Sequence, residues 1–428
     1  MKPCPIIDLE MALRVLLLWE MPQTFGKSYI RLKIRIDFLG VLFFEISRQR
    51  IEKAAYSNEP IETVKVAGEM TLSEKIAAKS ATYTSRASIF WFRFIHKIAP
   101  GFFNIKAIES HIFNLGYAYP DELFRTAIPE KKLLWAEVIP GLKETYRFSD
   151  EPSYYQMYAD AKFAYTWKKS GWDCLRHYEI IANGAIPVFP DLINCPKETL
   201  SHFPKDLIIQ ANKELLPWKD QPEYHKKYQD YARKILSESQ KNTSCSAVAK
   251  SFLNNLGARS NQKILFLNCD TNVNYSRETL FIGLSRLVES GDGTCHAFPR
   301  LNYLYDSFPS DKASKCYGKG FGYTRRLTEN KSDEKLPSTI ETIANSISEK
   351  YWDFIVYGKM GIDEGILGTA PSCPFWKTVS EAYSNEEIAF VYGGDHIQDL
   401  KDMGSPYSRH LVKHAALGKC FVRELKVS

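Results

Sequence analysis

Along residues 130–257, short apolar runs alternate with longer amphipathic segments. The pattern predicts strands at 162–166, 186–189 and 207–209, and helices at 172–183, 222–239 and 245–256. Gly184 stands just beyond helix 172–183, where a glycine commonly ends a helix. Because strands and helices alternate in this part of the chain, we expect them to build a parallel sheet.

The alternation is clearer beyond residue 258, after a short stretch of small and polar residues at 257–262. Here the pattern predicts strands at 263–267, 353–357, 388–392 and 420–422, and helices at 277–288, 339–350, 375–383 and 408–417. A Tyr- and Gly-rich insertion at 300–336 interrupts the series. We expect a complete Rossmann-like lobe. The first strand is not followed by a GxGxxG sequence, which disfavours a dinucleotide cofactor.

The first 130 residues show no clean hydrophobic period. They mix apolar runs with basic residues, and the aromatic-rich segment 89–98 is typical of core. We predict two regions, one at 1–257, with its readable lobe at about 130–257, and one at 258–428. The predicted fold class is α/β with two Rossmann-like lobes.

Composition and charge exclude several classes of protein. The chain has 428 residues, 13% of them aromatic, and 56 Lys and Arg against 50 Asp and Glu. The net charge of +6 is spread along the chain, without the basic stripe of a nucleic-acid binder, and it suits an anionic small ligand. An apolar run long enough to span a membrane, a signal-peptide cleavage site and a CxxC pair are all absent. We expect a cytoplasmic protein without a disulfide framework or zinc site.

The segment 166–189 carries the candidate chemistry. Lys168 and Lys169 precede the predicted helix 172–183, whose N-terminus favours anions. Arg176, Glu179 and Asn183 share one face of that helix. Cationic groups for a diphosphate, beside a carboxylate that can accept hydrogen bonds from ribose hydroxyls, are typical of a nucleotide-sugar site. The alternative is a surface pair between Arg176 and Glu179 on an ordinary amphipathic helix, beside a solvated lysine turn.

The sequence RHYEIIANGAIPVF at 176–189 resembles the donor-site signature of exostosin-like glycosyltransferases, and a weaker similarity covers 115–205. The resemblance implies a GT-B-type architecture, a nucleotide-sugar donor bound by the 130–257 lobe, and inversion at the anomeric carbon. It implies that Glu179 binds the donor ribose and Arg176 the diphosphate, while Gly184 and Pro187 shape the turn under the nucleotide. Ala185 stands where the family often has Cys.

The lobe order departs from that family. In exostosin-like enzymes the donor lobe comes last, whereas here a second lobe follows it. Residues 263–268, 274–278 and 418–425 weakly resemble the first lobe of other GT-B glycosyltransferases. The chain is therefore expected to be a fused or truncated arrangement, with residues 1–130 as a reduced acceptor-side lobe.

An inverting transfer needs a general base. Asp191, after strand 186–189, and Asp173, at the start of helix 172–183, are the first candidates, and Glu151, Asp270 and Asp395 are further carboxylates placed to reach a cleft. A sugar-stacking wall could come from Tyr303, Tyr305, Tyr317, Phe321 and Tyr323, and the alternative is that this Tyr-rich loop packs on its own lobe. The sequence lacks a DxD motif, so we predict no essential metal and no other cofactor, with a divalent cation left open.

The predicted function is a hexosyl- or pentosyltransferase that moves a sugar from a nucleotide-sugar donor to a glycan or other hydroxyl acceptor. The expected partners are that donor and that acceptor, without nucleic acid and without a transmembrane segment. Two alternatives stay open: a non-catalytic nucleotide- or carbohydrate-binding protein with a decayed transferase site, and an α/β hydrolase of sugar phosphates or nucleotides.

Overall fold

The computed structural model of the chain describes residues 32–36, 42–46, 109–329, 335–360, 373–402 and 404–427. The chain divides into two compact units, Met1–Thr84 and Ser85–Ser428. In the first unit, β1 (Leu32–Ile36) pairs antiparallel with β2 (Leu42–Ile46). The aromatic-rich segment 89–98, predicted to be core, lies outside the described residues.

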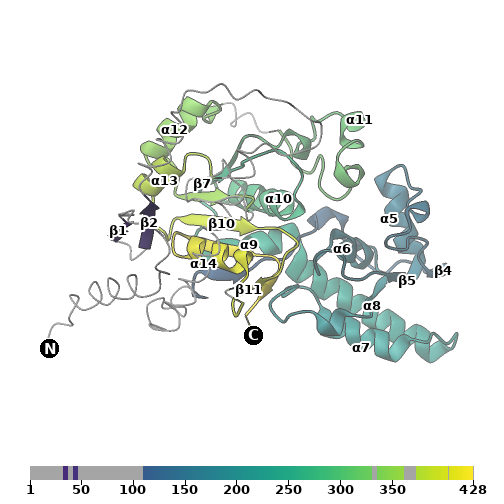
Figure 1. The fold of residues 1–428 in the computed structure, drawn as a ribbon. Coiled ribbons are helices and arrows are strands. Elements are labelled where there is room, and N and C mark those ends of the chain that lie inside the picture. The colour runs from purple at the N-terminus through teal and green to yellow at the C-terminus, as the bar shows by residue number, and fades with distance from the viewer. Residues whose placement is uncertain are drawn as a thin grey trace, which may run out of the picture. The chain divides into compact units, whose positions relative to one another are not determined.

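The second unit contains a six-stranded parallel sheet, which has more strands than the other sheets of the described residues (Figure 1). Its strands, in spatial order, are β3 (Ile112–Asn114), β12 (Lys419–Val422), β10 (Ile388–Tyr392), β9 (Phe354–Tyr357), β7 (Lys263–Leu267) and β8 (Thr294–Phe298). All five pairings are parallel. The four strands predicted beyond residue 258 are confirmed. Strand β8 was not predicted, because its residues alternate between buried and half-buried and make no continuous apolar run.

Helices cover both faces of this sheet. Alternate side chains of a strand point to opposite faces, so Ile264 and Phe266 of β7 belong to one hydrophobic cluster while Leu265 and Leu267 belong to another. The first cluster includes residues of α9 (Cys245–Leu256) and α10 (Tyr275–Ser290). The second includes residues of α12 (Ile340–Ser348), α13 (Trp376–Ala382) and α14 (Pro406–Ala415). This arrangement confirms an α/β fold around a parallel sheet.

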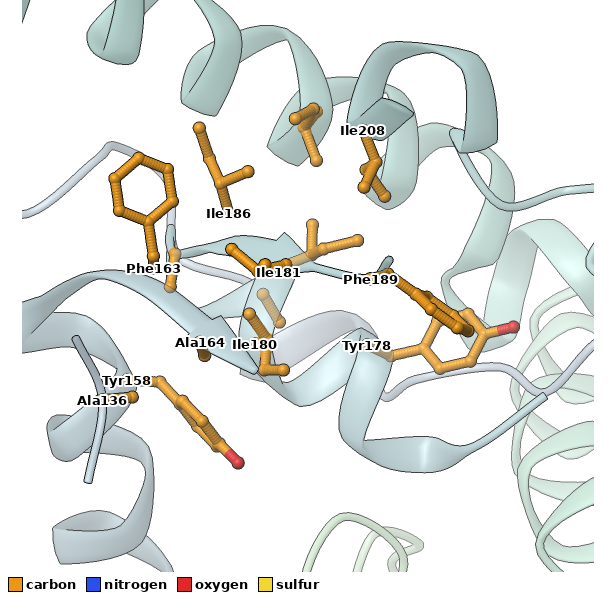
Figure 2. Close-up of a cluster of buried hydrophobic side chains, with 14 of the residues drawn as sticks. Ala136, Tyr158, Phe163, Ala164, Tyr178, Ile180, Ile181, Ile186, Phe189 and Ile208 are labelled. Atoms are coloured by element: carbon orange, nitrogen blue, oxygen red, sulfur yellow. The ribbon is translucent and has the colours of Figure 1, made fainter. Parts of the chain in front are cut away.

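A smaller parallel sheet lies in the predicted 130–257 lobe. It consists, in order, of β4 (Leu133–Trp135), β5 (Ala161–Tyr165) and β6 (Ile186–Val188). Its helices are α5 (Glu151–Asp160), α6 (Leu175–Ala182), α7 (Lys205–Leu215) and α8 (Pro222–Thr243). Figure 2 shows Tyr158 of α5 and Ile208 of α7 on opposite sides of the strands. Both sides of this sheet are therefore packed.

The strand predicted at 207–209 is wrong, because these residues belong to α7. Ile208, Ala211 and Leu215 are all buried, and their spacing of three and four residues is that of one helix face. The apolar run at 207–209 was too short to distinguish a strand from a helix turn. The helices predicted at 222–239 and 245–256 are confirmed as α8 and α9.

Helix α6 ends as its glycine predicts. Gly184 has a φ of +73°, a conformation that glycine adopts at little cost. Its N–H donates to the carbonyl of Ile181 at 2.8 Å, and the N–H of Ala185 donates to the carbonyl of Ile180 at 3.1 Å. These two bonds form a Schellman motif, which satisfies carbonyls at the end of the helix. The chain then turns directly into β6.

The strands of the six-stranded sheet come partly from before and partly from after the small sheet along the chain. β3 precedes the small sheet along the chain, yet it pairs with β12 near the C-terminus. Two short strands, β11 (Gln398–Asp399) and β13 (Leu425–Lys426), pair parallel with each other. The insertion at 300–336 contains the helix α11 (Ser310–Ala313). The domain division at residue 257 stays a prediction. In the described part of the chain, no helix combines the length and the apolarity that crossing a membrane requires.

Candidate functional site

A cavity of about 810 Å³ opens where loops of the two sheets meet. Its lining includes residues from the segments that follow β4, β5, β7 and β10, namely 141–148, 169–179, 273–275 and 393–395, together with residues 317–321 of the insertion. These loops all leave the carboxyl ends of parallel strands, the edge at which open α/β sheets bind ligands. The volume lies in the range of small-molecule sites.

The start of α6 is held in place by the C-terminal segment of the chain. The backbone N–H of Asp173 donates to Oε1 of Glu424 at 2.9 Å, and its carbonyl accepts from Nη1 of Arg423 at 2.6 Å. A Cβ at Gly171 would lie only 2.6 Å from the same Glu424 oxygen, so the close approach requires glycine. Residues more than 200 positions away thus fix where α6 enters the cavity.

Arg176 lines the cavity with unsatisfied donors. Its Nε and Nη1 atoms are buried and have no hydrogen-bond partner among the described residues. The guanidinium carbon lies 5.7 Å from the centre of the Tyr146 ring. Buried N–H groups without acceptors are costly, and a charged guanidinium all the more so. Arg176 is therefore prepared for an anionic group that enters the cavity.

Glu179 lies one helix turn further along α6 and also lines the cavity. Its side chain is buried, and Oε2 accepts a hydrogen bond from the hydroxyl of Tyr154 at 2.9 Å. Tyr154 in turn stacks on Phe321 of the insertion, with ring centroids 5.6 Å apart. Burial raises the pKa of the Glu179 carboxyl to about 7, against the hydrogen bond from Tyr154 and the charge of Arg176, which lower it. This carboxyl can therefore change its protonation state near neutral pH.

We expect this raised pKa to appear in the pH dependence of stability. Between the ordinary value of 4.5 and about 7, the folded protein holds a proton on Glu179 that the unfolded chain has lost. The free energy of unfolding therefore falls as the pH rises through this window. Glu179→Gln removes this contribution, so its melting temperature should fall less than that of the wild type between about pH 5 and about pH 8. Parallel melting curves across that range would contradict the assignment.

The two lysines before α6 have different environments. Lys169 lines the cavity, whereas Nζ of Lys168 lies 5.4 Å from the centre of the Trp172 ring and is not part of the lining. Two further lysines, Lys143 and Lys319, line the cavity but were not predicted from the sequence. With Arg176 the lining holds four cationic side chains, against the carboxyls of Asp173, Glu179 and Asp395. The cavity thus combines groups for an anion with carboxyls for hydroxyls.

The other residues predicted to bind the donor lie outside the cavity lining, at the far end of α6. Asn183 donates to the carbonyl of Glu179 and accepts from Nε of Arg125, and Gly184 ends the helix. Pro187 lies within β6. Asn183 shares a helix face with Arg176 but lies two turns further along, outside the cavity lining. The contacts of Asn183, Gly184 and Pro187 hold the fold of the lobe together.

The two predicted bases differ in their placement. Asp173 borders the cavity, but Oδ2 accepts from the backbone N–H of Tyr117 at 2.7 Å and Oδ1 from the hydroxyl of Tyr178 at 2.9 Å. It is buried, and burial raises its pKa. Asp191 follows β6 and lies outside the cavity lining, with Oδ1 buried and unpartnered among the described residues. This geometry favours a positioning role for Asp173 and places Asp191 outside the cavity lining.

The three further carboxylates considered as bases differ in whether they line the cavity. Glu151 forms an ion pair with Arg326, and Asp270 forms one with Lys359 at 2.7 Å, and neither lines the cavity. Asp395 does line it, after β10. Of the aromatic residues considered for a stacking wall, Tyr317 and Phe321 border the cavity, and the buried Tyr303, Tyr305 and Tyr323 do not.

His177 has a structural role. Its Nε2 donates to the carbonyl of Trp172 at 2.9 Å, so its Nδ1 accepts from the hydroxyl of Thr166 at 2.8 Å. Burial lowers its pKa to about 3, which keeps the ring neutral. It supports the loop between β5 and α6.

Comparisons of this chain with family models, with curated proteins and with solved structures found no match.

Proposed function

We propose that the protein is a glycosyltransferase whose nucleotide-sugar donor binds in this cavity. The observation that carries the proposal is the guanidinium of Arg176, whose buried Nε and Nη1 atoms have no partner among the described residues, next to the buried carboxyl of Glu179 on the same helix face. Arg176 would bind the diphosphate of the donor, and Glu179 would accept hydrogen bonds from its ribose hydroxyls. These are the roles that the resemblance of residues 176–189 to exostosin-like enzymes implies.

The surroundings of this pair support the proposal. Lys169 and Lys143 border the same cavity and add positive charge where a diphosphate would leave. Cationic side chains aimed at developing negative charge are a major source of rate enhancement in group transfer. Tyr146 and Tyr154 supply aromatic surface beside Arg176 and Glu179, which suits the planar base or the sugar of a nucleotide.

The arrangement of the two sheets is compatible with a GT-B-type architecture. Such enzymes bind their substrates between two Rossmann-like lobes, and the cavity here is lined from loops of both sheets. The pairing of β3 with β12 gives a physical reason for the unusual lobe order, because the six-stranded sheet is built from segments before and after the small sheet. We propose that the lobe at 130–257 binds the donor. We assign the acceptor side to the six-stranded sheet instead of to residues 1–130, most of which lie outside the described residues.

Thermal shifts with UDP, GDP and their sugars test the proposal. At a ligand concentration of about 100 times Kd, binding should stabilise the protein by roughly 2.7 kcal/mol. We expect Glu179→Ala to lose most of the shift, because the ribose hydroxyls lose their acceptor. Glu238→Ala serves as the matched control, since Glu238 is exposed on α8.

The outcomes separate the alternatives. A shift that is equal in Glu179→Ala and in the wild type would contradict the role of Glu179. Binding without transfer to any hydroxyl acceptor would favour a nucleotide-binding protein, and release of phosphate without an acceptor would favour a hydrolase. A protein that shifts with none of these nucleotides would contradict the proposed function.

A further inference from the structure

Three carboxyl side chains line the cavity, and one of them differs from the other two. Asp173 and Glu179 come from the α6 side, are buried and accept hydrogen bonds from protein groups. Asp395 comes from the six-stranded sheet, and its side chain is 51% exposed. Its Oδ1 accepts from Nη2 of Arg423, and among the described residues no hydrogen-bond donor reaches Oδ2. Among the three, Asp395 is therefore the carboxylate that is both exposed and left with an oxygen that no donor in the described part of the chain reaches.

The position of Asp395 is fixed from two sides. It follows β10 after Gly393 and Gly394, and a Cβ at Gly393 would lie 2.6 Å from Oδ1 of Asn274. This close approach sets the turn against the start of α10. The second contact comes from Arg423. Its Nε donates to the carbonyl of Gly393 at 3.1 Å, and the same guanidinium forms an ion pair with the Asp395 carboxylate.

The guanidinium of Arg423 is itself held by several contacts. Its side chain is fully buried, and it also donates to the carbonyl of Asp173 at 2.6 Å and lies 4.5 Å from the centre of the Tyr117 ring. One side chain thus connects the start of α6, which presents Arg176, to the turn that presents Asp395. The two groups are held in a defined relation across the cavity.

We infer that Asp395 is the catalytic base that takes the proton from the acceptor hydroxyl. The inference rests on the proposed transfer. In the reaction, Oδ2 of Asp395 takes the hydroxyl proton as the acceptor oxygen forms its bond to the anomeric carbon of the donor. The bond from that carbon to the diphosphate oxygen breaks, and its electron pair stays on the diphosphate, which Arg176 holds. Asp395 follows β10 of the six-stranded sheet, whereas Arg176 lies on α6 beside the small sheet, so the base and the leaving-group site come from different parts of the fold.

The wall beside Asp395 indicates what the acceptor is. Tyr275 follows Asn274 at the start of α10, and its ring centroid lies 5.8 Å from that of Tyr317. Both line the cavity, and Tyr317 is 71% exposed. Exposed aromatic faces beside polar groups suit a ligand with both apolar and hydroxyl-bearing faces. A carbohydrate has this character, and the inference assigns a sugar hydroxyl as the acceptor group.

Asp395→Asn tests the assignment, because the amide oxygen can still accept from Arg423 while the base is lost. The assay measures UDP or GDP release from UDP-glucose, UDP-N-acetylglucosamine, UDP-glucuronate and GDP-mannose, with 4-nitrophenyl glycosides as acceptors. We expect kcat to fall by about 100- to 1,000-fold, with the Kd for the nucleotide and the melting temperature unchanged. Asp399→Asn is the matched control, since Asp399 forms an ion pair with Lys426 at 2.8 Å outside the cavity.

Other results would overturn the assignment. If Asp395→Asn keeps more than about a third of the wild-type kcat, another group is the base. A parallel loss of nucleotide affinity or of thermal stability would show that Asp395 only supports the fold, and an equal loss in Asp399→Asn would show the same. Failure of the wild type to bind any nucleotide would instead refute the proposed function, and the role of Asp395 with it.

Discussion

Arg176→Met is expected to reduce nucleotide affinity by at least about 100-fold, equivalent to ~2.8 kcal/mol. The substitution removes two buried donors, Nε and Nη1, together with the charge that would face a diphosphate. Hydrogen bonds between charged groups in a desolvated site are among the strongest in proteins. Titration calorimetry with UDP and GDP measures the loss.

The same substitution should leave the ligand-free protein as stable as the wild type, or slightly more stable. The unpartnered donors of Arg176 are a cost to the folded protein that a methionine side chain of similar length does not carry. A residue that binds ligand and a residue that supports the fold thus differ in a measurable way. Arg233→Met, on the exposed face of α8, is the control. A destabilised Arg176→Met protein, or one that binds nucleotide as the wild type does, would contradict the assignment.

The sequence predicts the centre of each sheet better than its edges. β7 and β10 have continuous apolar runs because helices cover both of their sides, and such runs are visible without any structure. β8 lies at the edge, and its Thr294, His296 and Phe298 are only half-buried, so its pattern is weak. β3 has three residues, and its pairing with β12 is set by contacts some 300 residues apart, which no local pattern contains.

For the candidate site too, the sequence predicts some residues and misses others. Arg176 and Glu179 are three residues apart on one helix, so helical spacing was enough to place them on one face, and both border the cavity. Lys143, Lys319 and Arg423 reach the cavity or its wall from distant loops, and nothing in their local sequence distinguishes them from solvated residues. Asn183 shows the limit of helical spacing, since it shares the face of Arg176 but lies outside the cavity lining.

Charged side chains around the cavity differ in whether their hydrogen bonds are satisfied within the protein. Arg176 keeps unsatisfied donors, and Glu179 has a pKa near neutrality, so under the proposed function both groups would gain hydrogen bonds from the donor. Arg423 is fully paired, and it connects the two sheets instead of facing the ligand. Part of the cost carried by the free protein thus falls on residues proposed to bind, as expected where function competes with stability.

Arg423→Met should lower the free energy of unfolding by about 3–5 kcal/mol, because it breaks a buried ion-pair network by removing one partner. Glu424 would lose its ion pair at 3.2 Å while Oε2 is already buried and unpartnered, and the carbonyls of Asp173 and Gly393 would lose their donor. Chemical denaturation compares the variant with the wild type. Arg286→Met is the matched control, since Arg286 also pairs across the two sheets, with Glu122, but is partly exposed. Such pairs contribute at most about 1 kcal/mol.

The deficit of Arg423→Met should also depend on pH. Burial raises the pKa of Glu424 to about 7 even though the charge of Arg423 lowers it, so loss of that charge raises the pKa further. A carboxyl with a raised pKa stabilises the fold at low pH and loses that contribution as the pH rises. The deficit should therefore be larger at about pH 8 than at about pH 6, and Arg423→Met with Glu424→Gln should remove the difference. A deficit that is the same at both pH values would show that Glu424 carries no unpaired charge, and that the loss comes from the carbonyls alone.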